Sequence, residues 1–108
     1  MAVYSSAGIY TGLKSILYDG KKAIGKEAIL NACLLDVDFA KKVINIADWK
    51  GLLAKIYFND NQTALVKKFP KSAYYRFHFK VINVMREPSE PSRVTGITEG
   101  NLIGITKN

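Results

Sequence analysis

The sequence contains very few of the residues that build disulfides, metal sites and catalytic triads. Among its 108 residues it has one cysteine, Cys33, and one histidine, His78. A single cysteine has no partner for a disulfide within the chain, and neither residue has neighbours at the spacing of metal ligands, which excludes a structural zinc site. We therefore expect a protein without a bound metal or other cofactor.

Long apolar runs are also missing. No stretch approaches the roughly 20 apolar residues that a membrane-spanning helix needs, and the first six residues lack the charged start and apolar core of a secretion signal. Hydrophobic residues still make up 48% of the chain, which suffices for one core. We expect one cytoplasmic domain over residues 1–108 with no membrane partner, and a homo-oligomer stays open because small domains bury a smaller share of their surface.

Charge of one sign is in excess. The formal net charge is +7, which predicts attraction to polyanions, although most of the excess is lysine and lysine also serves as a solubilising surface residue. Lysine, isoleucine and asparagine are abundant. Low-GC coding sequences produce this composition, which suggests an origin in a low-GC bacterium or one of its phages.

Hydrophobic spacing predicts about four helices in the first half of the chain. They are expected over residues 9–18, 25–35, 37–47 and 49–57, with Ser5 or Ser6 as the first N-cap and Asp36 and Asp48 as later caps. The second helix is apolar on nearly every side, as a buried central helix is, and would bury Cys33. The fourth would bury one face, made of Trp49, Leu52, Leu53, Ile56 and Tyr57.

The character of the sequence changes after Asn61. Residues 63–69 fit either a short helix or a strand, and from Tyr74 to Met85 the hydrophobic period becomes two. This alternation predicts a strand that turns Phe77 and Phe79 toward the core. After a loop at residues 87–92, residues 94–97 and 102–105 are expected to form an antiparallel hairpin. The predicted fold class is α+β, with a helical N-terminal half packed on a small antiparallel sheet from the C-terminal half.

Residues 26–46 (KEAILNACLLDVDFAKKVINI) resemble the helical pair that opens the N-terminal domain of bacterial and phage replicative helicases. The resemblance covers about a fifth of the chain and includes no functional motif. It implies helices in this segment and no activity.

One constellation suggests a binding site. Between Asn61 and Arg86 the sequence has no acidic residue, while basic and aromatic residues alternate there. Cations neutralise phosphates and aromatic faces stack unpaired bases, so we interpret the segment as a candidate nucleic-acid site. Its residues are Lys67, Lys68, Lys71, Tyr74, Arg76, His78 and Lys80. The alternative is an ordinary amphipathic strand whose aromatic residues form the core and whose cations are solvated.

Catalytic and metal chemistry find little support. A catalytic imidazole lies beside a carboxylate that orients it, whereas His78 is expected to lie between Arg76 and Lys80 on its strand face. Asp36 and Asp38 could hold magnesium only with a third ligand, which no later motif supplies. We expect a small basic binding protein that is not an enzyme, most simply a nucleic-acid-binding accessory protein. The alternative is a protein-protein interaction module, such as an inhibitor, adaptor or virion component, that acts as a homo-oligomer.

Overall fold

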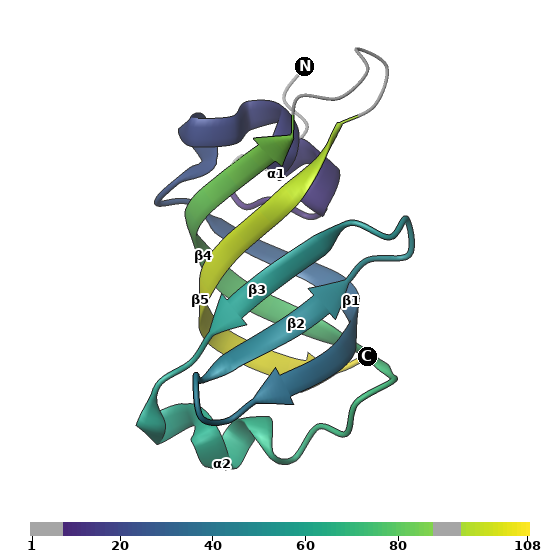
Figure 1. Ribbon diagram of the computed structural model, residues 1–108, viewed down its shortest axis with the longest axis vertical. Coiled ribbons are helices and arrows are strands. Elements are labelled where there is room, and N and C mark those ends of the chain that lie inside the picture. Colours follow the sequence, from purple (N-terminus) through teal and green to yellow (C-terminus); the bar gives the residue numbers. More distant parts are fainter. Residues whose placement is uncertain (1–7, 88–93) are drawn as a thin grey trace.

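The chain forms a closed barrel of five strands, which the computed structural model describes over residues 8–87 and 94–108 (Figure 1). The strands are β1 (Glu27–Asp38), β2 (Val43–Ala47), β3 (Leu53–Tyr57), β4 (Tyr74–Glu87) and β5 (Thr95–Lys107). Their order around the barrel is β1-β2-β3-β5-β4, and β4 closes the barrel by pairing with β1. Every neighbouring pair is antiparallel except β3 and β5, which are parallel.

Short helices cover the two ends of the barrel (Figure 1). At one end lie α1 (Leu13–Asp19) and the 3-10 helix η1 (Gly20–Ala23), and at the other lie the 3-10 helix η2 (Asp60–Gln62) and α2 (Thr63–Val66). Their buried side chains extend the core, and they are Leu13, Ile16, Leu17, Ala23 and Val66. No helix in the described part of the chain is long and apolar enough to cross a membrane.

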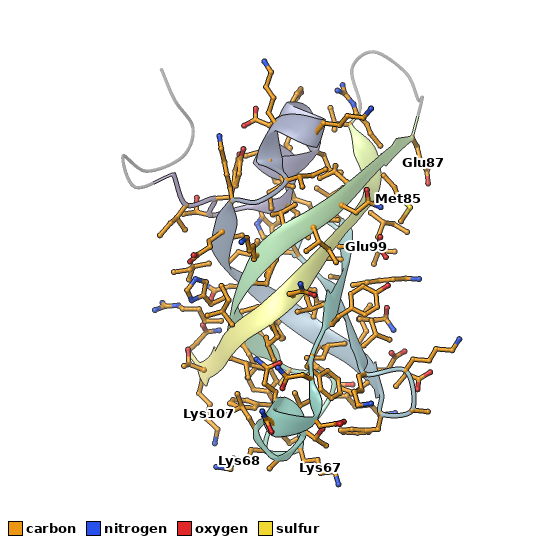
Figure 2. The ribbon with its side chains drawn as sticks, turned by 90° about the vertical axis from the view of Figure 1, so that its left-hand side faces the viewer. Lys67, Lys68, Met85, Glu87, Glu99 and Lys107 are labelled. Carbon is orange, nitrogen blue, oxygen red and sulfur yellow. The ribbon has the colours of Figure 1, made fainter. Side chains whose placement is uncertain are left out.

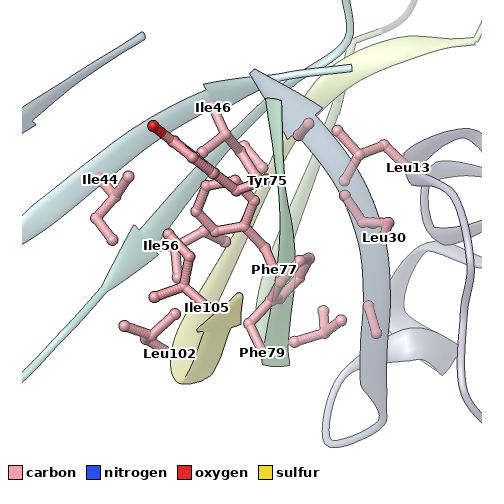
Figure 3. Close-up of a cluster of buried hydrophobic side chains, with 14 of the residues drawn as sticks. Leu13, Leu30, Ile44, Ile46, Ile56, Tyr75, Phe77, Phe79, Leu102 and Ile105 are labelled. Carbon is pink, nitrogen blue, oxygen red and sulfur yellow. The ribbon is translucent and has the colours of Figure 1, made fainter. Parts of the chain in front are cut away.

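On the inward sides of the neighbouring strands β1 and β4, two alanines lie beside large aromatic side chains. Ala28 pairs with Phe79, and Ala32 pairs with Tyr75. Figure 3 shows the rings of Tyr75, Phe77 and Phe79 within the cluster of aliphatic side chains. Small residues opposite large ones allow a narrow barrel to be filled without voids.

The predicted helical half is wrong, because residues 27–57 form three strands. In β1 the side chains of Ala28, Leu30, Ala32 and Leu34 alternate inward, while outward positions include the apolar Ile29 and half-buried Cys33. Because β1 has apolar residues on both faces, its sequence shows no clear period of two and resembles that of a buried helix. Cys33 is therefore not a core residue, and the segment that resembles the helicase helices contains β1 and β2.

The third and fourth predicted helices, over residues 37–47 and 49–57, are likewise replaced by the end of β1 and a hairpin of β2 and β3. The expected buried face of the fourth helix is not formed, since Trp49 is 78% exposed and Leu53 is 44% exposed. Asp36 and Asp48 do not cap helices. Asp48 Oδ1 accepts hydrogen bonds from the backbone N–H groups of Lys50 (3.0 Å) and Leu52 (2.9 Å), which stabilise the turn between the two strands.

The strand prediction for β4 is confirmed, since Phe77 and Phe79 are completely buried. The first predicted helix is found in shorter form as α1, whereas its proposed caps, Ser5 and Ser6, lie outside the described residues. Residues 63–69 form the short α2 followed by a turn. Most of the predicted loop at 87–92 lies outside the described residues, which resume at Val94.

The predicted C-terminal hairpin is one continuous strand, β5. Gly100, which lies between the two predicted strands, serves close packing instead of a turn. A Cβ at Gly100 would collide with the Phe79 ring and lie 2.9 Å from the carbonyl oxygen of Lys80. Glycine within a strand often marks such a close approach between neighbouring chain segments.

Candidate nucleic-acid interface

The predicted lysine and arginine side chains are exposed, and they lie near α2 and on the outward face of β4. Lys67 and Lys68 lie at the α2 end of the molecule, whereas Glu87, the neighbour of Arg86, lies at the opposite end (Figure 2). The acid-free run from Asn61 to Arg86 therefore extends along a molecule whose longest dimension is 40 Å.

Four of the predicted residues lie on the outward face of β4. Arg76 and Lys80 are exposed and Tyr74 is 49% exposed. His78 Nε2 lies 2.6 Å from Glu27 Oε1 of the neighbouring strand. The expectation that His78 has only cations around it is wrong, because Glu27 is 51 residues away in the sequence and only the β1–β4 pairing brings it close.

The other predicted lysines follow β3 in the chain and lie near α2. Lys67 Nζ lies 5.6 Å from the centroid of the Phe39 ring, which belongs to the connection between β1 and β2. Lys67 and Lys71 line the same pocket, and Lys68 is exposed beside them. These lysines therefore belong to the same region of the surface as Phe39.

A groove with a volume of about 690 Å³ lies on the outer face of β1, β2 and β3. It runs beside the connection between β1 and β2, which carries Phe39 and Lys41. Its lining residues are Asp36, Val37, Asp38, Phe39, Lys41, Val43, Asn45, Lys55 and Tyr57. We call this hollow the β2–β3 groove.

Several hydrogen bonds shape the end of the groove formed by the β1–β2 connection. A register shift between Leu34 and Asp36 changes the outward side of β1. Asp38 Oδ1 then accepts a hydrogen bond of 2.9 Å from the backbone N–H of Lys41. The carbonyl of Lys42 accepts one of 3.0 Å from the backbone N–H of Phe58, which ties the connection to the end of β3.

The polar side chains on this face are fixed by hydrogen bonds to one another. Asn45 donates to Asp36 Oδ1 at 2.7 Å, and the Tyr57 hydroxyl donates to Glu99 Oε2 at 2.8 Å. Asn83 donates to Glu99 Oε1 at 2.9 Å. The hydrogen bonds from Asn83 and Tyr57 lower the pKa of the Glu99 carboxyl group. The hydrogen bond to the Glu99 carboxylate in turn raises the pKa of the Tyr57 hydroxyl.

Exposed aromatic rings lie at both ends of β2. Phe39 is 44% exposed before the strand, and Trp49 is 78% exposed in the turn that follows it. Lys50 Nζ lies 5.2 Å from the centroid of the Trp49 ring. Each of these rings thus has a lysine close to its face, a combination that suits stacked bases with adjacent phosphates.

Sequence reasoning missed Phe39, Lys41, Trp49, Lys55 and Tyr57 as site residues because it assigned their segment to helices. The signal that could have found them is the alternation within residues 43–47 and 53–57, where Asn45 and Lys55 separate buried apolar residues. The turn between these short segments then predicts a hairpin.

In the described residues, no group of three or more histidine, cysteine, aspartate or glutamate side chains is placed to hold a metal ion. Asp36 and Asp38, the pair considered for magnesium, instead accept hydrogen bonds from Asn45 and Lys41.

No protein-family model matches the chain, and a comparison with curated proteins finds no match either.

Proposed function

We propose that this protein binds single-stranded nucleic acid along the β2–β3 groove and acts as a binding protein rather than an enzyme. The observation that carries the proposal is the groove itself, which is lined by Lys41 and Lys55 together with the rings of Phe39 and Tyr57. Cations that follow the backbone and aromatic rings that stack bases are the two elements of single-strand recognition.

The architecture of the barrel favours the same face. Five-stranded Greek-key barrels of the OB-fold type bind oligonucleotides or oligosaccharides on strands 2 and 3 and on the loops after strands 1 and 4. In this chain that surface contains the β2–β3 groove and the β1–β2 connection. This analogy concerns the fold alone. The net charge of +7 favours a nucleic acid over a neutral saccharide.

The carboxylates on this face restrict the path of the backbone. Asp36, Asp38 and Glu99 would repel phosphates, but carboxylate oxygens can accept hydrogen bonds from the amino groups of bases. We therefore place phosphates beside Lys41 and Lys55 and the bases over the aromatic rings. The carboxylates then face base edges rather than phosphates.

The charge arrangement can be tested with two matched double variants. Binding of an oligothymidylate of about twelve nucleotides, within the roughly 4–16 that one such barrel covers, would be measured by fluorescence anisotropy at several salt concentrations. Lys41→Ala with Lys55→Ala should weaken binding and reduce the salt slope by about 0.7 per lost phosphate contact. Arg76→Ala with Lys80→Ala removes the same charge from the formal +7 and should leave the slope nearly unchanged.

The reverse result would move the binding surface to the outward face of β4, which carries four of the site residues predicted from the sequence. No binding at low salt by the unaltered protein would contradict the function itself. The stacking component has its own comparison. Trp49→Ala should weaken binding by ~1–3 kcal/mol, the usual effect of removing one stacking ring, whereas Tyr74→Ala on β4 should have little effect.

An outward apolar row favours the second candidate function, association with another copy of the chain. Ala47, Leu53, Ile97 and Met85 are paired in succession across β2, β3, β5 and β4. Exposed apolar rows of this kind occur at protein interfaces. Sedimentation velocity over a range of concentrations would detect a dimer, and Leu53→Glu should then dissociate it, whereas a monomer at every concentration would contradict this function.

A further inference from the structure

A second hollow adjoins the β2–β3 groove, between α2 and the connection from β1 to β2. Its volume is about 300 Å³, and we call it the α2 pocket. The residues that line it are Leu34, Val37, Phe39, Val66, Lys67, Phe69 and Lys71. Because Val37 and Phe39 line both hollows, a ligand in the groove can continue past Phe39 into the pocket.

The chemistry of the α2 pocket differs from that of the groove. The groove is lined by two lysines and two aspartates, so its charges balance. The α2 pocket is lined by five apolar side chains and by Lys67 and Lys71, with no carboxylate among its lining residues. It therefore suits a ligand that combines an apolar or aromatic body with a negative charge.

The walls of the pocket are held in place by contacts outside it. The Phe39 ring packs edge-on against Phe58, with ring centroids 6.0 Å apart, and Phe58 is buried. On the opposite wall, the Phe69 ring packs edge-on against Tyr75 at 5.0 Å. The hydroxyl of Tyr75 in turn donates to the carbonyl of Pro70 at 2.7 Å. Such support keeps both rings oriented before a ligand arrives.

The segment that carries Lys71 is fixed to the end of β1. The backbone N–H of Ser72 donates to the carbonyl of Leu34 at 2.7 Å, and the N–H of Leu34 donates to the carbonyl of Ala73 at 2.9 Å. Ser72 has a φ of 70°, in the left-handed region that non-glycine residues seldom adopt. Surrounding structure must hold such a conformation, and it is common next to ligand-binding residues.

We propose that the α2 pocket receives one nucleobase of the bound single strand, while Lys67 and Lys71 bind the adjacent phosphate. The inference rests on the proposed function and extends it, because the strand then turns from β2 and β3 toward α2. The lysines supply the charge that a phosphate requires, and the apolar walls supply the surface for a base.

Methyl groups that line only one of the two hollows provide a direct test. Val43 lines the β2–β3 groove, whereas Leu34 and Val66 line the α2 pocket. In methyl NMR spectra of the full chain, the oligothymidylate should shift the signals of all three residues. A shift at Val43 without shifts at Leu34 and Val66 would overturn the inference and leave the proposed function intact. Absence of any binding would overturn both.

A matched pair of variants tests the lysines. Lys67→Ala with Lys71→Ala should lower affinity and reduce the salt slope by about 0.7 per lost phosphate contact. The control is Lys68→Ala with Lys107→Ala, which removes equal charge from the same end of the molecule but not from the pocket lining (Figure 2). Equal effects of the two double variants would overturn the assignment of Lys67 and Lys71.

The identity of the occupant is tested with altered ligands. An oligonucleotide that lacks one base but keeps every phosphate should bind roughly 5- to 150-fold more weakly when the missing base is the one in the pocket. The same ligand should not shift the Val66 signals. If thymidine monophosphate also shifts the Val66 signals and binds as tightly as the oligonucleotide, the pocket is a site for free nucleotides and the strand assignment is wrong.

Discussion

Tyr57 and Glu99, on the parallel strands β3 and β5, are joined by a hydrogen bond of 2.8 Å from the hydroxyl to Oε2. Asn83 of β4 donates to the other oxygen of the same carboxylate. One acidic residue thus links the three strands that include the only parallel pair among those the structure describes.

The hydrogen bonds from Asn83 and Tyr57 hold the pKa of Glu99 below its ordinary value, so its ionised form stabilises the fold. This contribution is present above the unfolded-state pKa and is lost as the pH falls through the lower folded-state pKa. Glu99→Gln should therefore reduce stability near neutral pH by at most about 1 kcal/mol at this outer surface. Urea unfolding across acidic pH should show that difference shrink, and a constant difference would contradict the role of the charge.

The same pair affects Tyr57 in the opposite direction. The hydrogen bond to Glu99 is the larger cause and burial the smaller one, and together they raise the pKa of Tyr57 above 10.0. The stability that this hydrogen bond contributes is therefore lost as the pH rises through the folded-state pKa of Tyr57. An alkaline titration of tyrosinate absorbance, compared with that of Tyr57→Phe, should assign the difference to one late-titrating group. Glu99→Gln should lower the midpoint of that group, and an unchanged midpoint would show that burial alone sets it.

Thr98 is the one buried residue of the described chain whose side-chain oxygen has no hydrogen-bond partner. Thr98→Val replaces that hydroxyl by a methyl group of similar size and should increase the free energy of unfolding by about 1 kcal/mol. Chemical denaturation would measure the change. Thr98→Ser, which keeps the hydroxyl and removes the methyl group, should be destabilising. A destabilised valine variant would show that a buried water satisfies Thr98.

Gly100 and Gly104 offer a matched comparison within β5. A side chain at Gly100 would collide with Phe79, whereas nothing lies within 4 Å of a Cβ at Gly104. Gly100→Ala should cost ~1–3 kcal/mol because the packed interior must move. Gly104→Ala should change stability by no more than about 0.5 kcal/mol. Equal thermal midpoints for the two variants would contradict the close packing of β5 on β4.

Leu53 and Ile56 lie on opposite faces of β3. Leu53 is 44% exposed, whereas Ile56 is completely buried. Ile56→Ala should cost ~2–5 kcal/mol, the range for large-to-small changes in a core. Leu53→Ala should cost less than about 1 kcal/mol, and a core-sized loss would show that Leu53 is covered in solution, as the dimer interface would require.

The contrast between β4 and β1 explains which strands could be predicted from sequence. In β4 the outward side chains of Arg76, His78 and Lys80 are polar, so a period of two is visible in the sequence itself. In β1 the outward Ile29 is apolar, and the small inward Ala28 is matched to Phe79, a residue 51 positions later. Small, helix-favouring residues become strand residues through such distant partners, which local patterns do not contain.

The candidate site divides in the same way. Sequence analysis selected Lys67 and Lys71 from the absence of acidic residues around them, and the structure places both at the α2 pocket. It could not associate them with Phe39, because that contact depends on how α2 packs against the β1–β2 connection. The sequence also showed no sign of Glu27 beside His78, because that contact depends on the register of β1 against β4. The charged segments could thus be found from composition, whereas the residues that lie next to them depend on the topology of the fold.

The position of β5 between β3 and β4 has a consequence for synthesis of the protein. During translation β5 emerges after the other four strands, and until then β3 and β4 each have an unpaired edge. The nascent chain therefore cannot complete its barrel while residues 95–107 are still inside the ribosome. Nascent chains stalled before this point would expose both edges, and exposed strand edges of this kind can pair with other chains.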